Sequence, residues 1–348
     1  MRIAIATVQI PFVVGGAEQL SASLRDAIVE RGDEADIVAL PFKWYPAAEI
    51  PKHVLMARLV DLSESNGRAI DRVIALKFPA YCVRHPHKVL WLLHQHRPAY
   101  ELWGTPDCDL MRFADGREVR DFIHAADRRF IAEAFAVHGI SREVVERLKG
   151  FPNVDPRPLY PPPERAETFR CDDYGDYVFF PSRIGPYKRQ LLLIDAMARV
   201  RSPIRCVLAG AGAEPDIAFQ VEHRINVHGL QERVRLAGEI SHEDKIRYYA
   251  GALAVFFGPM REDYGFVTLE AFLSRKPVVT CRDSGGPLEF VENGVNGFVV
   301  EPDADAIAAR LDELYFDRRR ARSLGEAGLE TYRSRRISWQ TTLDRLLA

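Results

Sequence analysis

The chain has 348 residues, about twice the usual length of a single domain, and 47% of them are hydrophobic, so two domains with separate cores are expected. A formal net charge of −2 gives no overall attraction for a polyanion, which excludes the general electrostatic case for a nucleic-acid partner. The five cysteines show no Cys-x-x-Cys pair, and no apolar run approaches membrane-spanning length. We therefore expect a soluble, cytoplasmic protein with reduced thiols.

The first half of the chain alternates predicted strands and helices. Residues 2–8 form a continuous apolar strand, Gly15 and Gly16 lie in the loop that follows, and an apolar periodic helix runs from about Ala17 to near Gly32. Further strands are predicted at 35–40, 72–76 and 89–93, and Ser141 is a predicted N-cap for a helix over 142–148. This alternation is typical of a parallel α/β sheet.

A proline-rich stretch at 151–163 forbids a regular helix and marks the end of the first domain. A second set of strands is predicted at 177–180, 205–209, 234–236, 254–257 and 277–280, which indicates another open α/β sheet. The segment from 303 is helical by pattern, with Trp339 as a packing anchor. We predict domains over 1–160 and 177–330, a linker over 161–176 and a C-terminal helix over 331–348.

Loops after the predicted strands carry the candidate site residues, because open α/β sheets bind ligands beyond the carboxyl ends of their strands. Gly15 and Gly16 precede a helix, so backbone N–H groups could face an anion there; a flexible turn is the alternative. Arg183 and Lys188 flank Gly185 after a strand and could reach a diphosphate; a solvated charged loop is the alternative.

Two glutamates with seven residues between them, Glu262 and Glu270, lie on either side of Gly265, and Glu270 falls in the first turns of a predicted helix that starts near Phe266. The helix N-terminus favours an anion, Glu270 could accept hydrogen bonds from ribose hydroxyls, and Glu262 could meet another part of the same ligand. The alternative is that Glu270 only complements the helix dipole and that Glu262 is a loop carboxylate.

Taken together, these segments resemble the retaining glycosyltransferases of family four. That family has the α/β GT-B fold, in which two Rossmann-like, doubly wound domains face a cleft and a C-terminal helix crosses back to the first domain. The resemblance covers most of the chain and rests on Gly15-Gly16 with Glu18, Ser182-Arg183 with Lys188, Leu208 to Gly212, Leu236-Ala237-Gly238 before Ile240, Glu262 to Glu270, and Gly285-Gly286 with Glu289.

The resemblance implies an N-terminal acceptor domain, a C-terminal nucleotide-sugar donor domain and a role for each motif. Arg183 and Lys188 would neutralise the donor pyrophosphate, Glu270 would bind ribose, Glu262 would hold sugar hydroxyls, and Ile240 would meet the base, with Gly210 also in the donor-binding set. Backbone groups of Gly265, Phe266 and Val267 would cap the distal phosphate, and Gly15 and Gly16 would close over the phosphates.

The run Leu90 to His96 resembles the family's strand that ends in a histidine facing the anomeric carbon of the donor sugar. His94 fits better than His96 because it comes first after the apolar strand; a buried histidine satisfied by a backbone carbonyl is the alternative. Arg275 departs from the family, which commonly has glycine before the Lys276-Pro277 pair. That departure puts the local loop geometry in doubt.

The expected activity is retaining, metal-independent transfer of a hexose-type sugar from a UDP or GDP sugar to a saccharide, lipid-linked or small-molecule hydroxyl acceptor. The leaving diphosphate takes the acceptor proton, and His94, Arg183, Lys188 and Glu262 are the candidate catalytic residues. Bacterial polysaccharide, lipid-linked glycan or glycoconjugate biosynthesis is the expected setting. The alternatives are a non-hydrolysing nucleotide-sugar epimerase and a catalytically silent nucleotide-sugar-binding subunit.

We expect no metal and no further cofactor. The Asp107-Cys108-Asp109 sequence has a metal-binding form that is common by chance, and His85-x-His87 and His94-x-His96 lack further ligands. A basic and aromatic cluster in the first domain leaves peripheral contact with the inner face of a membrane open. That cluster consists of Arg84, His85, His87, Lys88 and Arg97 with Tyr81, Trp91, Tyr100 and Trp103.

Overall fold

The computed structural model describes residues 1–12, 15–105, 108–210 and 215–348, and it divides into two compact units. Unit 1 comprises Met1–Glu164 together with Ser338–Ala348, and unit 2 comprises Arg165–Ile337. Unit 2 ends at Ile337, beyond the end at residue 330 predicted for the second domain. The last helix of unit 2 continues past residue 330 and has its C-cap at Arg335, whose backbone N–H contacts the carbonyl groups of the last turn.

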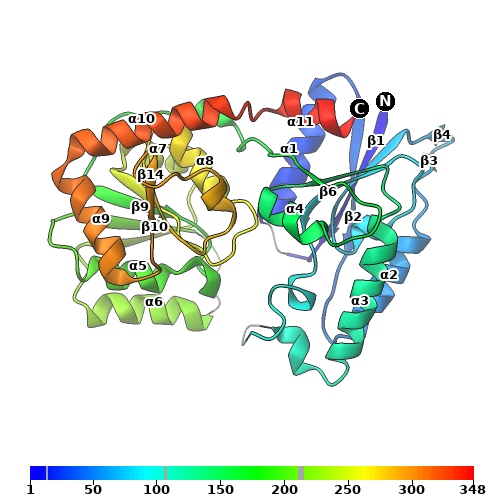
Figure 1. Ribbon diagram of the computed structural model, residues 1–348, viewed down its shortest axis with the longest axis horizontal. Coiled ribbons are helices and arrows are strands. Elements are labelled where there is room, and N and C mark those ends of the chain that lie inside the picture. The colour runs from blue at the N-terminus through cyan, green and yellow to red at the C-terminus, as the bar shows by residue number, and fades with distance from the viewer. Residues whose placement is uncertain (13–14, 106–107, 211–214) are drawn as a thin grey trace. The chain divides into compact units, whose positions relative to one another are not determined.

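Unit 1 is a parallel sheet with helices packed against it (Figure 1). In the described part of the chain its six strands lie in the order β2-β1-β5-β6-β7-β8. From β1 the chain crosses to β2 on one side, and later strands, beginning with β5, are added on the other side of β1. Because both crossovers are right-handed, their helices cover opposite faces of the sheet. Accordingly, α1 contacts α11, whereas α2 contacts α3.

The helices and strands of unit 1 have the following bounds: β1 Arg2–Gln9, α1 Gly16–Glu30, β2 Glu34–Pro41, α2 Glu49–Leu59, β3 Glu64–Ser65, β4 Arg68–Ala69, β5 Arg72–Lys77, β6 Lys88–His94, α3 Gly116–Ile131, β7 Ala136–Gly139, α4 Arg142–Leu148, β8 Arg157–Pro158 and α11 Trp339–Leu346. Ser141 accepts a hydrogen bond from the backbone N–H of Val144, so the predicted N-cap of α4 is confirmed.

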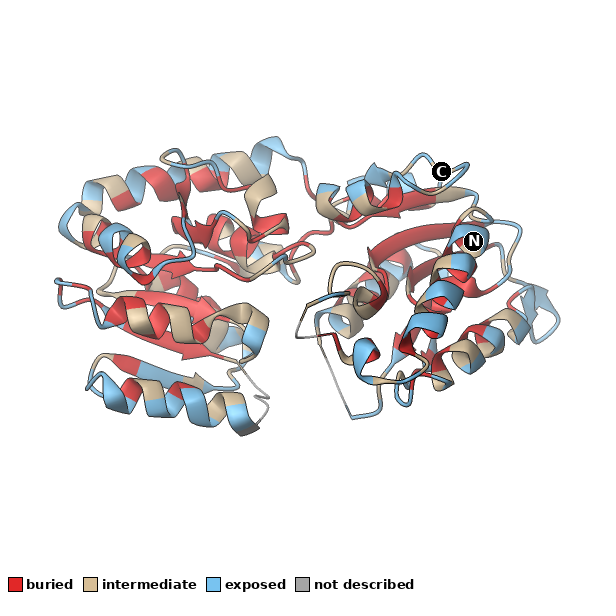
Figure 2. Cartoon of the chain, turned by 60° about the horizontal axis from the view of Figure 1, so that its bottom comes forward, coloured by how far each residue is buried: buried red, intermediate tan, exposed pale blue. Residues whose placement is uncertain are grey.

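Unit 2 repeats this architecture with a second parallel sheet. The strands of its described residues lie in the order β11-β10-β9-β12-β13-β14, so the chain changes direction across the sheet between β9 and β12. On one side α5 contacts α6 and α9, and on the other α8 contacts α10. Each sheet is the buried layer of its own unit, and the helices turn exposed faces outward (Figure 2).

The helices and strands of unit 2 have the following bounds: β9 Tyr177–Pro181, α5 Gln190–Met197, β10 Arg205–Ala209, α6 Pro215–Val227, β11 Val234–Gly238, α7 His242–Gly251, β12 Ala254–Phe256, α8 Phe266–Leu273, β13 Val278–Cys281, β14 Gly297–Val300, α9 Ala304–Phe316 and α10 Arg318–Ser334. The predicted alternation of strands and helices is confirmed in both halves.

The last helix of the chain, α11, belongs to unit 1, as the sequence predicted. The indole of Trp339 packs edge-on against the buried Trp91, with ring centroids 6.3 Å apart. Arg72, the first residue of β5, donates hydrogen bonds of 2.8 Å to the backbone oxygens of Leu346 and Ala348. These bonds fix residues 346–348 to the N-terminal end of that strand.

Candidate functional site

The candidate site lies at the carboxyl ends of the strands in unit 2. Arg183 and Lys188 follow β9, and Glu262 follows β12, which are the neighbouring strands between which the chain reverses its direction across the sheet. Open α/β sheets bind ligands at such a switch point, because the loops of the two strands diverge and leave room between them. The topology therefore brings the predicted cations and carboxylates to one edge.

The loop after β9 is held by contacts with Gly210 and Gln190, and it leaves the Arg183 side chain exposed. Gly210 packs so tightly against this loop that a Cβ atom there would lie 2.1 Å from the carbonyl oxygen of Ser182. The buried Gln190 donates a hydrogen bond of 3.1 Å to the carbonyl of Arg183. The Arg183 guanidinium is exposed and, among the described residues, has no hydrogen-bond or ion-pair partner.

Lys188 and Glu262 form an ion pair. The Lys188 Nζ donates to the Glu262 Oε2 at 2.5 Å, and each side chain is about a quarter exposed. Lys188 also lies over the ring of Phe257, with its Nζ 5.7 Å from the ring centroid. Two residues that lie 74 positions apart in the sequence thus form a direct contact, which the sequence did not predict.

The Glu262 backbone is fixed by the glycine pair after β13. Glu262 donates its N–H to the carbonyl of Ser284 at 2.8 Å, and Gly286 donates to the carbonyl of Glu262 at 2.7 Å. Gly285 has a φ of +73°, and a Cβ atom there would lie 2.5 Å from the Glu262 carbonyl oxygen. Glycine is needed at this position both for its backbone conformation and for this close approach.

Helix α8 begins at Phe266, as predicted, directly after Gly265 with a φ of +89°. Gly265 places the helix N-terminus without a side-chain cap, and Phe266 and Val267 are only partly buried there. Backbone N–H groups of a first helical turn have no partner within the helix. The geometry is that expected for an anion at this helix end.

The Glu270 carboxylate is buried, with 6% of the residue exposed, and each of its oxygens accepts one side-chain hydrogen bond. Lys245 donates to its Oε1 at 2.8 Å and the Tyr249 hydroxyl donates to its Oε2 at 2.7 Å. Burial and the adjacent Glu270 raise the pKa of Tyr249 well above its usual value, so this hydroxyl remains a donor. Sequence reasoning missed Lys245 and Tyr249, although their i, i+4 spacing on α7 places both on one helix face.

The remaining donor-binding candidates of unit 2 lie in two neighbouring loops. Ile240 is partly buried between β11 and the start of α7, where Ser241 caps that helix. Gly210 donates its N–H to the carbonyl of Gly238 at 2.8 Å, which ties the loop after β10 to the loop after β11. The rest of the predicted Leu208 to Gly212 turn, Ala211 and Gly212, lies outside the described residues.

Gly15 and Gly16 stand at the start of α1 in unit 1. Glu18 accepts the backbone N–H of Gly15 at 2.8 Å, so this N–H is already engaged. The Lys77 Nζ lies 4.0 Å from the same carboxylate. A Cβ atom at Gly16 would meet nothing within 4 Å, so packing within unit 1 does not require glycine there.

His94 ends β6 with its ring partly exposed, and its Nδ1 lies 2.7 Å from the carbonyl oxygen of Gln95. His96 is instead buried against Phe42 and Phe78, and burial lowers its pKa to about 3. His96 is therefore neutral near pH 7 and shielded from solvent. Within unit 1 the His94 ring is the more accessible of the two, and its role at a ligand stays a prediction.

The predicted basic and aromatic cluster in unit 1 lies only partly at the surface, where Arg84, His85, His87, Arg97, Tyr100 and Trp103 are exposed or partly exposed. Tyr81, Lys88 and Trp91 are buried, with 1%, 1% and 0% exposure. The Lys88 ammonium donates to the backbone carbonyl groups of Tyr81, Val83 and Phe130, so it supports the interior of the unit. The inclusion of Lys88 in a surface cluster was wrong, because this lysine at the start of β6 points into the unit. Within the described ranges, no helix is long and apolar enough to cross a bilayer.

The sequence patterns that could bind a metal ion lack further ligands among the described residues. Asp109 accepts a hydrogen bond of 2.8 Å from the Trp44 indole, and Asp107 lies outside the described residues. His85 contacts the carbonyl of Ile70 through its Nε2. No group of three His, Cys, Asp or Glu side chains among the described residues could hold a metal ion. That the activity needs no metal stays a prediction.

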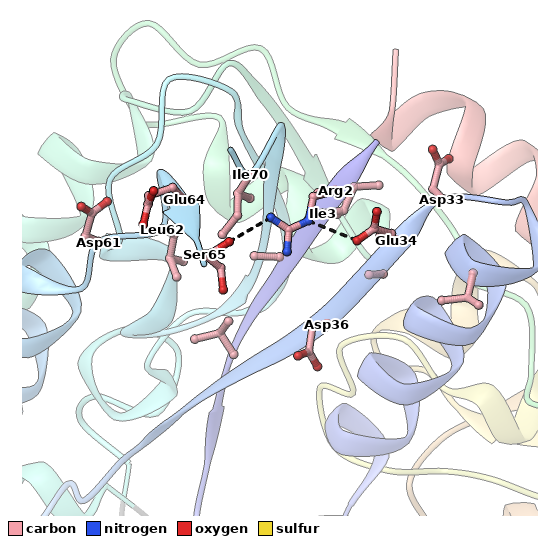
Figure 3. A pocket seen from close by; sticks show the side chains of 14 residues that line it. Arg2, Ile3, Asp33, Glu34, Asp36, Asp61, Leu62, Glu64, Ser65 and Ile70 are labelled. Carbon is pink, nitrogen blue, oxygen red and sulfur yellow. Dashed lines mark hydrogen bonds and ion pairs between the residues drawn. The ribbon is translucent and has the colours of Figure 1, made fainter. Parts of the chain in front are cut away.

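A cavity of about 630 Å³ in unit 1 lies away from these residues (Figure 3). Its lining includes Arg2 at the start of β1 and Glu34 at the start of β2, and Arg2 donates to the Glu34 carboxylate and to the carbonyl of Ser65. This end of the sheet is opposite to the carboxyl ends, where open α/β sheets bind their ligands. The cavity is therefore distinct from the candidate site.

Arg275, the departure from the family pattern, adopts a left-handed backbone conformation with a φ of +52°. Glycine adopts this conformation without strain, whereas arginine does so at a cost. The following residue, Lys276, is fully buried and contacts Cys171 and the Asp173 carbonyl. The loop therefore has the geometry that a glycine would favour, even though arginine occupies the position.

Comparison with protein families gives a match over residues 167–331 to the family model for glycosyl transferases group 1. Over this segment, which spans most of unit 2, the chain is similar to glycosyl transferases group 1. The matched segment contains Arg183, Lys188, Glu262 and Glu270, so the candidate site falls within it.

Curated relatives agree with this class of enzyme. The GDP-mannose-dependent alpha-(1-6)-phosphatidylinositol monomannoside mannosyltransferase of Mycobacterium tuberculosis is 29% identical over 272 residues, which cover 74% of this chain and 68% of that protein. The D-inositol 3-phosphate glycosyltransferase of Corynebacterium glutamicum is 29% identical over 180 residues, or 49% of this chain and 41% of that protein. These matches support a glycosyltransferase.

Solved structures share the fold. HepE from Anabaena, in complex with UDP and glucose, matches with a TM-score of 0.73 at 20% identity and covers 100% of this chain and 98% of its own. Sucrose-phosphate synthase from Thermosynechococcus elongatus matches with a TM-score of 0.78 at 19% identity, with 99% and 97% covered. At these identities the matches show the fold alone, and the prediction of a GT-B fold is confirmed.

Proposed function

We propose that the protein is a retaining, metal-independent glycosyltransferase that moves a hexose from a nucleoside-diphosphate sugar to a hydroxyl acceptor. The observation that carries this proposal is the set of charged groups at the switch point of unit 2. Lys188 meets Glu262 there, Glu270 is held in a fixed orientation, and Arg183 has an exposed guanidinium without a partner among the described residues. This set lies within the segment that matches group 1 glycosyl transferases.

Each group has a distinct task in the proposed donor site. Arg183 offers a planar fork and Lys188 a point charge, which together suit a diphosphate. The uncapped N-terminus of α8 after Gly265 adds backbone N–H donors for the distal phosphate. Glu270 accepts from ribose hydroxyls and Glu262 from sugar hydroxyls, while the Ile240 segment meets the base.

The proposed chemistry involves no covalent intermediate on either glutamate. Both oxygens of the Glu270 carboxylate accept strong hydrogen bonds, and the group is buried, so it is poorly suited to attack carbon. Glu262 is paired with the cation that would bind the leaving diphosphate. We therefore propose front-face transfer, in which the diphosphate accepts the acceptor proton and Arg183 and Lys188 stabilise the developing charge.

The donor is proposed to be a GDP or UDP hexose. The Mycobacterium tuberculosis relative is named for GDP-mannose and the Anabaena structure contains UDP and glucose, so these nucleotides are the first to test. A saccharide, lipid-linked or small-molecule hydroxyl is the proposed acceptor, in bacterial polysaccharide or glycoconjugate biosynthesis. The roles of His94, Gly15 and Gly16 in unit 1, and peripheral contact with a membrane, stay predictions.

Nuclear magnetic resonance of the reaction tests the activity. The protein is incubated with GDP-mannose or UDP-glucose and a panel of saccharide and lipid-linked acceptors, and the anomeric configuration of the new product is read from its one-bond carbon–proton coupling. The proposal predicts transfer with the configuration of the donor retained and with full activity in the presence of a metal chelator. An inverted product, or epimerised donor without transfer, would contradict it.

A further inference from the structure

The two carboxylates of the candidate donor site are held in different ways. Among the described residues Glu262 has one side-chain partner, the Lys188 ammonium, and both side chains are about a quarter exposed. Glu270 has two donors, and one of them is the hydroxyl of Tyr249, a residue with 0% exposure. An exposed ion pair exchanges partners at little cost, whereas a buried carboxylate with two donors is fixed.

The Lys188 to Glu262 pair joins two groups that the proposed function assigns to different parts of the donor. Lys188 is assigned to the diphosphate and Glu262 to the sugar. In the observed structure these two groups neutralise each other at 2.5 Å. A diphosphate that takes the Lys188 cation must therefore compete with Glu262 for it.

We propose that Glu262 is an internal competitor of the donor diphosphate, so that the site favours an intact nucleotide sugar over the product nucleoside diphosphate. This inference rests on the proposed function. The diphosphate displaces Glu262 from Lys188, and the carboxylate released in this way binds the hydroxyl groups of the sugar. No bond is formed or broken in the exchange.

The exchange affects donor and product differently. An intact donor compensates for the lost ion pair, because its sugar hydroxyls give Glu262 new hydrogen-bond partners. A nucleoside diphosphate without a sugar displaces Glu262 but offers it no replacement. After transfer, Glu262 therefore competes again for Lys188, which weakens product binding and favours release.

Calorimetric titration of the whole chain with GDP, GDP-mannose, UDP and UDP-glucose tests the exchange in the wild type, Glu262→Gln and Glu262→Ala. For the nucleotide pair that binds the wild type, we expect Glu262→Gln to raise the affinity for the nucleoside diphosphate about two- to fivefold. The same substitution should lower the affinity for the sugar conjugate. The ratio of donor to product affinity therefore falls in both variants, provided that thermal melting shows them to be folded.

Two controls separate the possible outcomes. Glu270→Gln also removes a carboxylate that pairs with lysine, yet it should weaken both ligands because Glu270 is assigned to the ribose they share. Asp305→Asn removes a charge from an exposed ion pair on α9 and should change neither affinity. A parallel rise for both ligands in Glu262→Gln, or no change in either, overturns the exchange. Failure of every nucleotide to bind the wild type overturns the proposed function itself.

Discussion

At the scale of single residues, the orientation of Glu270 depends on a tyrosine that the sequence motifs do not include. Tyr249 is buried, packs edge-on against Phe179 and donates its hydroxyl to the Glu270 carboxylate at 2.7 Å. It does not need to touch a ligand to matter, because it fixes the carboxylate proposed to bind ribose. We regard it as a positioning residue.

Tyr249→Phe tests this role. The substitution keeps the ring and removes one hydrogen bond to a charged group, worth about 1.5–3 kcal/mol. We expect the KM for the donor to rise about tenfold or more while kcat changes little, measured by steady-state kinetics. Tyr248→Phe is the matched control, because the Tyr248 ring also packs on Phe179 and, among the described residues, its hydroxyl makes no hydrogen bond to Glu270. Equal KM values for the two variants would count against the role.

Substitution of Arg275 tests how much its left-handed backbone conformation lowers the stability of the fold. Arg275→Gly relieves that backbone strain, which is of the order of 1–2 kcal/mol, and loses an exposed ion pair with Glu326 that is worth little. We expect the thermal unfolding temperature to be unchanged or higher. Arg275→Val, which is β-branched and poorly suited to this conformation, should lower it. A glycine variant less stable than the valine variant would refute the explanation.

Residues of the candidate site were predictable from the sequence only where they belong to a recognisable motif. Arg183, Lys188, Glu262 and Glu270 could be singled out because glycines and strand ends mark their loops. Their supporting partners were not predictable, because Lys245 and Tyr249 contact Glu270 through the packing of α7 against α8. Nothing in a single sequence shows which face of one helix meets another.

At the scale of elements, most strands with a continuous apolar run were predictable, whereas two strands without such a run were not. The strand at 205–209 was predicted with the bounds it has, because five residues in sequence favour a buried strand. By contrast, β7 is only Ala136–Gly139 and β8 only Arg157–Pro158. These segments become strands because they pair with β6 and with each other, which local sequence does not reveal.

A buried carboxylate joins three elements of unit 1. Asp127 on α3 is fully buried and accepts hydrogen bonds from the hydroxyls of Tyr81 and Tyr100 at 2.7 and 2.6 Å. Burial raises its pKa to about 7, although the two hydrogen bonds oppose this change. Since Tyr100 follows β6 closely, Asp127 anchors the loop that comes after His94 to α3.

The raised pKa predicts a pH-dependent stability. Above about pH 4 the unfolded state has lost the proton that the folded state keeps on Asp127. The stabilisation that comes from this proton is therefore fully present below that pH and is lost as pH rises toward 7. The free energy of unfolding should fall by at most about 1.4 kcal/mol per pH unit in that window. Urea unfolding from pH 4.5 to 7.5 measures it against Asp127→Asn, which removes the titration. A constant difference between the two proteins across this range would contradict the assignment.

At the scale of the whole molecule, the chain consists of two α/β units, and its last helix belongs to the first of them. Composition and the alternating pattern predicted two domains because such a length exceeds one hydrophobic core. The return of α11 to unit 1 depended instead on the family resemblance. Its energetic basis is visible in the structure, where Leu343 and Leu346 are buried at 3% and 0% exposure.

Removal of residues 338–348 should therefore destabilise unit 1. Each buried leucine contributes about 1.5–3 kcal/mol, and the packing of Trp339 on Trp91 is lost as well. We expect differential scanning calorimetry of the shortened chain to show a transition at clearly lower temperature. Leu346→Ala should give a smaller effect in the same direction, and Gln340→Ala, on the exposed face of α11, should give none. An unchanged melting profile for the shortened chain would show that α11 does not support the unit.

The central claim is that unit 2 holds a nucleoside-diphosphate sugar at the switch point of its sheet. Calorimetric titration of the wild type and Arg183→Ala with GDP, UDP and their hexose conjugates tests it most directly. We expect at least one nucleotide to bind the wild type and Arg183→Ala to weaken this binding about tenfold or more, because a charge-assisted hydrogen bond is worth about 1.5–3 kcal/mol. Equal affinity of both proteins for every nucleotide, or no binding at all, would contradict it.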